Sequence, residues 1–297
     1  MKKILILGAN GFVGKNLKEY LSQFADEYIL QTPSSKELNL LNEKDVKNYL
    51  NDNYFDVVIN AAVCNPIRGN RIDNQTELEQ DLRMYYVLKK YNNLYGKMLY
   101  FGSGAEFDKT EDIVAVTEND FNNNIPLTQY GLAKYIIGQD IESSKNIYNL
   151  RIFGLFGKYE NWRTTFISGA CCKALKGLPI TIRQNVYFDY MYIDDFCKII
   201  KWFIDNESKH HTYNITTGKK VDLVTIAETI NRLVENPVPI YVCKSGLANE
   251  YTADNKRLSL EVLNLKFRKM EKNISNLLKY YEENINEIDV YSLLYQN

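Results

Sequence analysis

Tyr130 and Lys134 are the two residues of this 297-residue chain whose types and spacing point most directly to acid–base chemistry. They stand four positions apart in YGLAKY, so they share one face of a helix predicted over residues 130–143. A phenol alone exchanges protons poorly at neutral pH, and an ammonium within about 4–6 Å stabilises its ionised form. The pair is therefore a candidate for exchanging a proton with a substrate oxygen.

The spacing alone does not single out this pair. Tyr-x-x-x-Lys occurs three times, at Tyr85–Lys89, Tyr86–Lys90 and Tyr130–Lys134. The composition predicts about two such occurrences by chance. Only Tyr130 begins a helix 27 residues after Ser103, which ends the predicted strand in MLYFGS. The first two pairs lie inside a long helix predicted over 76–95, where we interpret them as surface and packing residues.

A glycine-rich turn follows the first apolar segment, in LILGANGFVGKNL at residues 5–17. Glycines allow a tight turn with positive φ and let a phosphate approach the backbone, and the N-terminus of the following helix offers unpaired N–H groups. In this strand–turn–helix context the motif predicts a dinucleotide site. Its expected contacts are Gly8, Asn10, Gly11, Phe12, Val13 and Gly14.

The segment after the second predicted strand bears on which dinucleotide is bound. An NAD site usually has an Asp or Glu there, which holds the ribose hydroxyls. The sequence QTPSSK offers hydroxyls and an ammonium instead, from Thr32, Ser34, Ser35 and Lys36. These groups suit a 2′-phosphate, so NADP(H) is favoured and NAD is the alternative. A solvated loop that simply has no acidic residue also fits the sequence.

The elements that must hold these residues alternate along the first half of the chain. Short apolar runs at 4–7, 28–30, 56–60, 97–101 and 147–153 predict strands, and helices are expected near 12–24, 43–51, 76–95 and 130–143. Apolar strands separated by helices are typical of a parallel sheet covered on both faces, with ligands at the carboxyl ends of its strands. We therefore predict an α/β fold with a doubly wound parallel sheet.

The second half of the chain is less regular. It predicts helices near 164–176, 194–205, 223–235 and 271–284, with strands at 179–183, 212–215 and 238–242. We expect a Rossmann-like domain of residues 1–163 and about 188–215, and a smaller α/β substrate-binding domain of about 164–187 and 216–297. No linker separates them, so the two should be closely joined. Asp194 and Asp195 are expected to cap a helix.

Composition argues against several other classes of function. The net charge of −1 disfavours a nucleic-acid or membrane-surface binder. The five cysteines form no C-x-x-C pair and the two histidines are adjacent, so neither a disulfide framework nor a metal site is expected. The apolar start breaks at Gly8, and no run reaches the roughly 18 apolar residues of a membrane span. We expect a cytoplasmic protein.

Six motifs follow one another along nearly the whole chain: GANGFVG at 8–14, VINAA at 58–62, Ser103, Tyr130-x-x-x-Lys134, LRIFGLFG at 150–157 and FDYMYIDD at 188–195. Together they resemble the extended short-chain dehydrogenase/reductases that act on nucleotide sugars. TPSSKELNLLN at 32–42 is most similar to the GDP-fucose synthase-like 4-keto-sugar reductases, which use NADPH.

The resemblance implies roles for individual residues. Ser103 and Tyr130 would bind the reacting oxygen of the sugar, and Lys134 would also hold the nicotinamide ribose. Asn60, Ala61 and Ala62 would line the cofactor. The helices near 76–95 and 130–143 would pair with those of a second copy to form a homodimer.

The residues after Ser103 depart from two branches of this family. The 4,6-dehydratases resemble S/T-D-E, whereas this chain has Gly104 and Ala105, which cannot transfer protons. Enzymes similar to GDP-fucose synthase have a Cys at the position of Ala105 and a His elsewhere for epimerisation at C3 and C5. Glu106 is the remaining candidate base, and strand alternation is expected to turn it away from Ser103. Dehydration and C3/C5 epimerisation are therefore disfavoured.

Two further departures concern the substrate diphosphate. The family often has Asn where this chain has Gly154, and often has Arg where it has Phe188. A buried diphosphate still needs cations. The candidates are Arg68, Arg163 and Arg183, each of which could instead be an exposed surface charge.

The leading hypothesis is NADPH-dependent reduction of a nucleotide-linked 4-keto (6-deoxy) sugar, without epimerisation at C3 or C5. A nucleotide-sugar 4-epimerase with tightly bound NAD is the alternative enzyme. A non-catalytic NADP-binding regulator is a third hypothesis, although such proteins generally lose the Tyr–Lys pair.

Overall fold

A six-stranded parallel sheet forms the centre of the protein. The computed structural model describes residues 1–64 and 76–294, and orders the strands β10-β6-β4-β3-β1-β2. Their bounds are β1 (Lys2–Leu7), β2 (Tyr28–Gln31), β3 (Phe55–Asn60), β4 (Tyr95–Ser103), β6 (Ile147–Ile152) and β10 (Thr212–Ile215). All five pairings are parallel, which confirms the predicted fold class. The strand order reverses between β1 and β3, where such sheets form a ligand-binding crevice.

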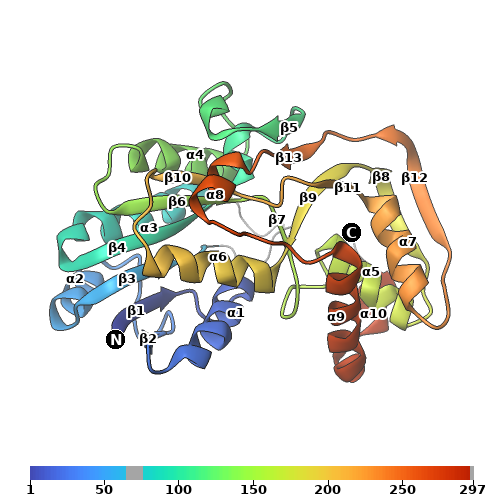
Figure 1. Cartoon of the computed structure of the whole chain (residues 1–297), viewed down its shortest axis with the longest axis horizontal. Helices are drawn as coiled ribbons and strands as arrows, with labels where there is room; N and C mark the ends of the chain where they lie inside the picture. Colours follow the sequence, from blue (N-terminus) through green and yellow to red (C-terminus); the bar gives the residue numbers. More distant parts are fainter. Residues whose placement is uncertain (65–75, 295–297) are drawn as a thin grey trace.

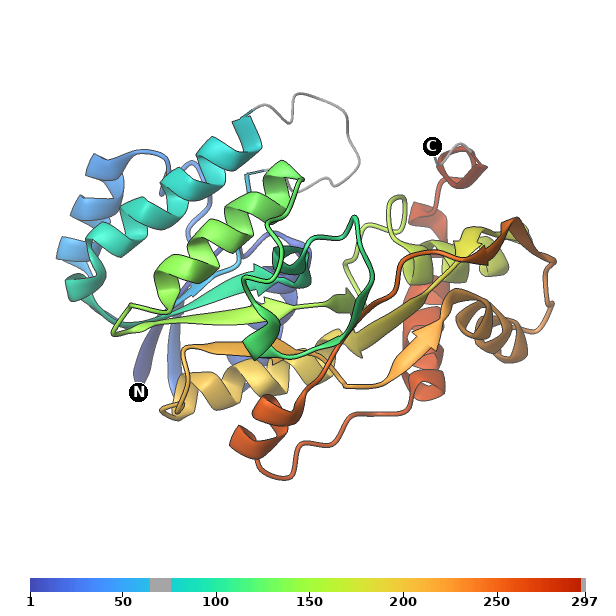
Figure 2. The same cartoon turned by 90° about the horizontal axis from the view of Figure 1, so that it is seen from above.

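Helices cover both faces of this sheet, because its apolar side chains alternate between them (Figures 1 and 2). Ile4 and Ile6 belong to the core on one face, whereas Leu5 and Leu7 belong to the core on the other. The first face carries α1 (Phe12–Leu21) and α6 (Ile193–Asp205). The second face carries α2 (Glu43–Asp52), α3 (Glu77–Lys90) and α4 (Gln129–Ile141).

The rest of the chain forms two smaller sheets and further helices, most of them on the right in Figure 1. One sheet has the order β11-β9-β13-β5, with β7 beside β9, and the other pairs β8 with β12. The strand bounds are β5 (Ile113–Val116), β7 (Gly154–Phe156), β8 (Ile180–Asn185), β9 (Tyr187–Tyr192), β11 (Lys220–Asp222), β12 (Ile240–Leu247) and β13 (Tyr251–Ala253). The helices are α5 (Phe166–Leu175), α7 (Leu223–Leu233), α8 (Lys256–Glu261), α9 (Met270–Glu283) and α10 (Val290–Leu294).

The boundary between the two parts crosses the segment predicted as 188–215. Helix α6 packs against α1, and β10 is an edge strand of the central sheet, whereas β9 pairs with β11 and β13 in the second sheet. One continuous core of buried apolar side chains runs from Ile4 in β1 to Ile226 in α7 and Leu277 in α9. The second part is therefore packed closely onto the first, and the division into two domains stays a prediction.

Several local expectations differ from the structure. Helix α3 ends at Lys90, because β4 already begins at Tyr95. Asp194 and Asp195 do not cap α6: its N-cap is Tyr192, and both acids lie in the first turn, where they pair with Arg268. Among the described residues, no helix is both long and apolar enough to cross a membrane.

Candidate active site

Ser103 is the last residue of β4, at the carboxyl edge of the central sheet. Its side chain caps a short 3₁₀ helix, Gly104–Phe107, by accepting a hydrogen bond of 3.2 Å from the Ala105 N–H. Its own N–H donates to Glu106 Oε1 at 3.0 Å. Two hydrogen bonds therefore fix the serine where the strand ends.

Helix α4 brings Tyr130 and Lys134 to the same edge of the sheet. Thr128 caps the helix by accepting from the Gly131 N–H at 3.1 Å. A Cβ on Gly131 would lie 2.8 Å from the Ala105 carbonyl oxygen, so the first turn of α4 packs directly on the turn after Ser103. Lys134 Nζ lies 5.7 Å from the centroid of the Tyr130 ring.

The structure thus gathers the three predicted catalytic residues at the end of β4. Tyr130 lies in the first turn of α4, where the helix N-terminus favours a developing negative charge on the phenol oxygen.

The glycine-rich turn has the geometry that a dinucleotide phosphate needs. Gly8 has a φ of 76°, and a Cβ there would lie 2.7 Å from the Ala61 carbonyl. A Cβ on Gly14 would lie only 2.2 Å from the Gly8 carbonyl oxygen. Helix α1 starts after Gly11 and has no acidic residue in its first turn, so its N–H groups and positive end face the turn. A bound pyrophosphate fits these residues.

The remaining predicted contacts lie around this turn. Asn10 and Gly11 are exposed, and Phe12 and Val13 are half-buried. Asn60 ends β3 opposite Leu7, and the Ala61 N–H donates to the Leu7 carbonyl at 3.1 Å. Asn60 Oδ1 accepts from the Ala62 N–H at 3.3 Å. The end of β3 therefore forms the wall beside Gly8.

The segment after β2 contains a carboxylate that the sequence analysis did not consider. Thr32 and Ser34 are half-buried, while Ser35 and Lys36 are exposed. The Ser34 N–H donates to Glu37 Oε2 at 2.7 Å, and this bond lowers the pKa of Glu37 below its usual range. The turn thus presents one cation and one anion. Charge alone does not decide between NADP(H) and NAD here.

Glu106 is buried in a charge network below Ser103. Its Oε2 accepts from Arg151 Nε at 2.8 Å, and both of its oxygens accept from Asn149 Nδ2. The Glu106 and Arg151 side chains are completely buried. Two glycines make room for the network: a Cβ on Gly102 would lie 2.4 Å from Glu106 Oε1, and one on Gly138 would lie 2.7 Å from Oε2.

The network shows that Glu106 is a structural anion. Arg151 lies between the rings of Phe107 and Phe121, 4.7 Å from each centroid, and donates to Asn214 Oδ1. The expectation that strand alternation turns Glu106 away from Ser103 is wrong, because residues 104–107 form a 3₁₀ helix and the carboxylate accepts from the Ser103 N–H. A signal was available, because Arg151 stands in the buried strand IYNLRI and a buried arginine requires a buried anion.

The residues that depart from the family pattern are explained by aromatic packing. A Cβ on Gly104 would lie 2.4 Å from the Tyr251 hydroxyl and 2.7 Å from the Phe153 ring. A Cβ on Gly154 would lie 2.9 Å from the Tyr190 ring. Phe188 packs against Tyr190 and Tyr251, with ring centroids 5.2 and 5.7 Å apart. An aromatic cluster therefore fills the space that larger polar side chains would take.

Two of the three candidate arginines lie in the described residues, and both are exposed. Arg163 is exposed and stacks on Trp162, with its guanidinium carbon 4.2 Å from the ring centroid. Arg183 is exposed on β8, in the second part of the molecule. Arg68 lies outside the described residues.

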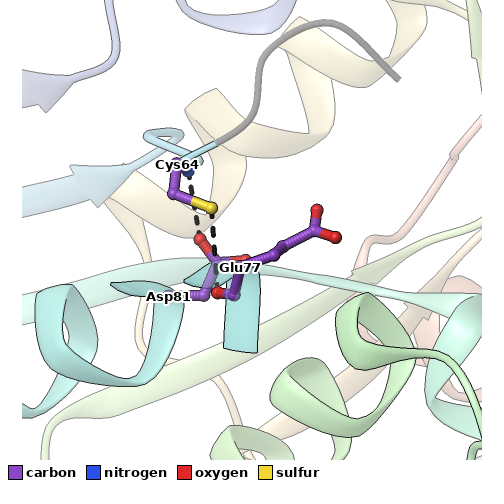
Figure 3. Close-up of side chains that lie close together, drawn as sticks. All are labelled: Cys64, Glu77 and Asp81. Carbon is purple, nitrogen blue, oxygen red and sulfur yellow. Dashed lines mark hydrogen bonds between the residues drawn. The ribbon is translucent and has the colours of Figure 1, made fainter. Parts of the chain in front are cut away.

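Cys64, Glu77 and Asp81 lie close together where the chain leaves β3, with one potential ligand atom each within 4.8 Å of the others. The Cys64 N–H donates to Asp81 Oδ1 at 3.1 Å, and its thiol contacts the Glu77 carbonyl oxygen at 3.7 Å (Figure 3). The Glu77 carboxylate points away from these bonds (Figure 3). The three residues fasten the end of β3 to the first turns of α3, and we infer no metal site from them.

Comparison with known proteins agrees with this geometry. The NAD dependent epimerase/dehydratase family profile matches residues 4–216. A GDP-L-colitose synthase from Yersinia pseudotuberculosis is 30% identical over 250 residues, covering 76% of this chain and 79% of that protein.

Two solved structures show the same fold. A GDP-D-glycero-L-gluco-heptose synthase from Campylobacter jejuni, determined in the presence of NADPH, matches with a TM-score of 0.81 at 17% identity, covering 95% of this chain and 98% of that one. A UDP-glucose 4-epimerase from Thermotoga maritima, determined with UDP-glucose, matches with a TM-score of 0.79 at 15% identity, covering 95% and 99%. From the matched profile and the Yersinia relative, this chain belongs to the NAD dependent epimerase/dehydratase family.

Proposed function

We propose that the protein reduces a nucleotide-linked 4-keto (6-deoxy) sugar to the corresponding hydroxy sugar, using NADPH. One observation carries this proposal. Ser103, Tyr130 and Lys134 lie at one edge of the sheet, and the only charged side chain in the turn after Ser103 is Glu106, which is held by Arg151 and Asn149. Proton donation to one oxygen is supported, and proton removal from a neighbouring carbon is not.

Each residue has a defined task in this proposal. The Ser103 hydroxyl binds the carbonyl oxygen and stabilises the negative charge that develops on it. Tyr130 gives its proton to that oxygen, aided by the N-terminus of α4 and by the Lys134 ammonium. The nicotinamide cofactor, when bound at the Gly8–Gly14 turn, supplies the hydride. Lys134 would also hold its ribose.

The relatives support the class of substrate. The Yersinia protein is named for a GDP-linked sugar, as is the Campylobacter protein, which was studied with NADPH. We therefore propose a nucleoside diphosphate sugar as substrate, with a GDP-linked 4-keto-6-deoxy sugar as the first to test. Arg163 and Arg183 are exposed and are proposed as contacts for the diphosphate.

The first experiment measures turnover and bound cofactor together. Purified protein should consume NADPH when a GDP-4-keto-6-deoxy sugar is added, and mass spectrometry should identify the hydroxy product. Protein that retains NAD through purification and interconverts 4-hydroxyl epimers without added NADPH would instead be a 4-epimerase. Glu37, a carboxylate beside the end of β2, is the observation that favours this alternative.

The cofactor preference has its own test. Lys36→Ala should weaken NADPH binding about tenfold and leave NADH binding within about twofold, because only NADPH carries the 2′-phosphate. Fluorescence titration of both cofactors measures the two constants. Equal losses for both would show that this turn does not distinguish them.

The proposed lack of epimerisation is tested in D₂O. C3 and C5 protons are acidic beside a keto group, yet their removal requires a positioned base. NMR of the product should show no enzyme-dependent deuterium at either carbon. Incorporation would reveal a base, and Glu106→Gln would be the first variant to examine.

We also propose that the protein is a cytoplasmic homodimer. Tyr86 on α3 is 41% exposed, and Leu78 and Leu82 are half-buried, so the outer face of this helix has apolar surface to cover. Sedimentation at micromolar concentration distinguishes a dimer from a monomer.

A further inference from the structure

Lys134 is a buried cation without a direct anionic partner. Only 3% of its surface is exposed, and it makes no ion pair with a carboxylate of the described residues. Its ammonium donates to two neutral oxygens, the Phe101 carbonyl at 2.9 Å and the Tyr100 hydroxyl at 2.8 Å. Burying a charge is costly unless nearby groups compensate it, so its surroundings should contain a further stabilising charge.

Tyr100 is held as a neutral phenol. Its side chain is buried in the core beneath α4, and this burial raises the pKa of Tyr100 well above its usual value. The charges of Asp81 and Glu106 raise this pKa further. Tyr100 therefore keeps its proton at every working pH, and its oxygen serves as a hydrogen-bond acceptor for Lys134.

Of the two carboxylates that act on Tyr100, only Asp81 is not neutralised. Glu106 is paired with Arg151. Asp81, on α3, is 6% exposed, and its Oδ1 accepts from the Cys64 N–H (Figure 3). Its buried Oδ2 accepts no hydrogen bond from the described residues. Its charge acts on Tyr100 and pairs with no cation among the described residues.

We propose that Tyr100 and Asp81 are positioning residues for Lys134. Tyr100 fixes the ammonium through a direct hydrogen bond, and the charge of Asp81 stabilises this Tyr100–Lys134 pair. An ammonium has three N–H donors, and the bonds to Tyr100 and Phe101 occupy two of them. The third is left to face Tyr130 and the cofactor. This inference rests on the proposed function only in that Lys134 acts together with Tyr130.

The first test is Tyr100→Phe, with Tyr85→Phe as its matched control. The two tyrosines are neighbours, with ring centroids 5.5 Å apart, and both are buried with hydrogen-bonded hydroxyls. Tyr100→Phe should lower kcat about tenfold, the size of one lost hydrogen bond to a charged group, and change KM for the keto sugar less than about twofold. Tyr85→Phe should leave both constants within about twofold.

A binding experiment supplies a readout independent of turnover. Tyr100→Phe should weaken NADPH binding about fivefold, because the lysine that holds the nicotinamide ribose is less well placed. A loss of this size corresponds to about one weak hydrogen bond. The same variant should leave 2′,5′-ADP binding unchanged, since this fragment lacks that ribose. Tyr85→Phe should change neither affinity. If the wild-type protein proves not to be a reductase, these affinities still test the role of Tyr100.

Asp81 is tested by Asp81→Asn, with Asp140→Asn on the neighbouring helix as control. Asp81→Asn can keep the hydrogen bond to the Cys64 N–H while removing the charge. It should lower kcat about fivefold, and the double variant Tyr100→Phe/Asp81→Asn should lose less than the product of the single losses, because both act on one lysine.

Three results would overturn the proposal. Equal kcat losses for Tyr100→Phe and Tyr85→Phe would assign Tyr100 a packing role only. Parallel weakening of NADPH and 2′,5′-ADP would mean that the whole cofactor site is distorted. Independent, multiplicative losses in the double variant would show that the two residues do not act through the same lysine. Thermal melts of every variant check that each is folded.

Discussion

Two helices packed side by side carry the same Tyr-x-x-x-Lys spacing in opposite surroundings. On α4, Lys134 contacts the neutral oxygens of Tyr100 and Phe101, and Tyr130 lies in the first turn, which packs on the turn after Ser103. On α3, both members of the pair bind one carboxylate on the partner helix: the Tyr85 hydroxyl donates to Asp140 Oδ2 at 2.6 Å, and Lys89 Nζ to Oδ1 at 2.5 Å.

The comparison shows that the Tyr-x-x-x-Lys spacing only brings the two side chains close together. The charges around them determine whether the lysine can act on the phenol. Burial and the Asp140 charge raise the pKa of Tyr85 far above its usual value, so this phenol is fixed as a hydrogen-bond donor. Its lysine is neutralised by the same carboxylate. The third pair is different again, because Lys90 binds Glu43 while Tyr86 is exposed. Only on α4 is the cation left available to the phenol.

The largest expected effect is the difference in turnover between Tyr130→Phe and Tyr85→Phe. Tyr130→Phe should reduce the proposed turnover about 10²–10⁴-fold, because it removes the proton donor, and should leave cofactor binding nearly intact. Tyr85→Phe should keep activity within about twofold. Steady-state kinetics with a 4-keto sugar nucleotide measure both. A Tyr130→Phe protein with near-full activity would rule out the proposed mechanism.

Substitution of the two lysines should also affect activity unequally, with a smaller difference between the variants than for the tyrosines. Lys134→Met removes the ammonium that aids Tyr130 and should cost about 10²-fold in kcat/KM, with weaker NADPH binding. Lys89→Met should leave kcat/KM within about threefold, since the charged and aromatic groups that Lys89 meets in the described part of the chain are Asp140 and the Tyr86 ring. Similar losses in both variants would contradict the distinction between the two helices.

The strong periodic signals of the central sheet were predictable, whereas most of the second sheet was not. Runs such as VVI at 57–59 are continuously apolar because both faces of the sheet are covered, so they stand out in the sequence. Strands β5, β7, β11 and β13 have only three or four residues each. Their pairing is set by contacts distant in sequence, as in the register of Tyr251 with Ile113, and no local pattern encodes it.

The parts of the candidate site in which the backbone conformation requires a particular residue type were predictable from the sequence. The parts that depend on side-chain contacts between distant segments were not. Gly8 and Gly14 are required by atoms of the same turn and the next strand, which a motif captures. The roles of Glu106 and Tyr100 depend on α4 and β6, whose side chains meet them only in the folded chain. The sequence predicted the candidate pair Tyr130–Lys134 and did not predict the residues that contact it.

For the free energy of unfolding, Tyr85→Phe should have a larger effect than Tyr130→Phe, the reverse of their expected effects on turnover. Tyr85→Phe removes a buried hydrogen bond to a charged carboxylate, so the free energy of unfolding should fall by about 1–2 kcal/mol. Tyr130 is half-buried, and Tyr130→Phe should change the free energy of unfolding by less than about 0.5 kcal/mol. Urea denaturation at pH 8 measures both. A larger loss for Tyr130→Phe would remove the structural role assigned to the α3 pair.

The smallest expected effect concerns how the contribution of Tyr85 varies with pH. Its pKa is higher in the folded protein than the value near 10 expected in the unfolded chain, so its stabilising effect is fully present below about pH 10. Above that pH the unfolded chain loses a proton that the folded protein keeps. Stability then declines by up to about 1.4 kcal/mol per pH unit for this one group.

Phenylalanine at position 85 cannot ionise, so Tyr85→Phe lacks this decline. The difference in unfolding free energy between wild type and Tyr85→Phe should be constant from pH 6 to 8, which serves as the internal control. It should shrink by about 1 kcal/mol between pH 10 and 11. Urea denaturation at the four pH values measures the difference. A gap that stays constant up to pH 11 would mean that Tyr85 ionises as easily in the folded protein as in the unfolded chain, and Asp140 would then not hold its proton.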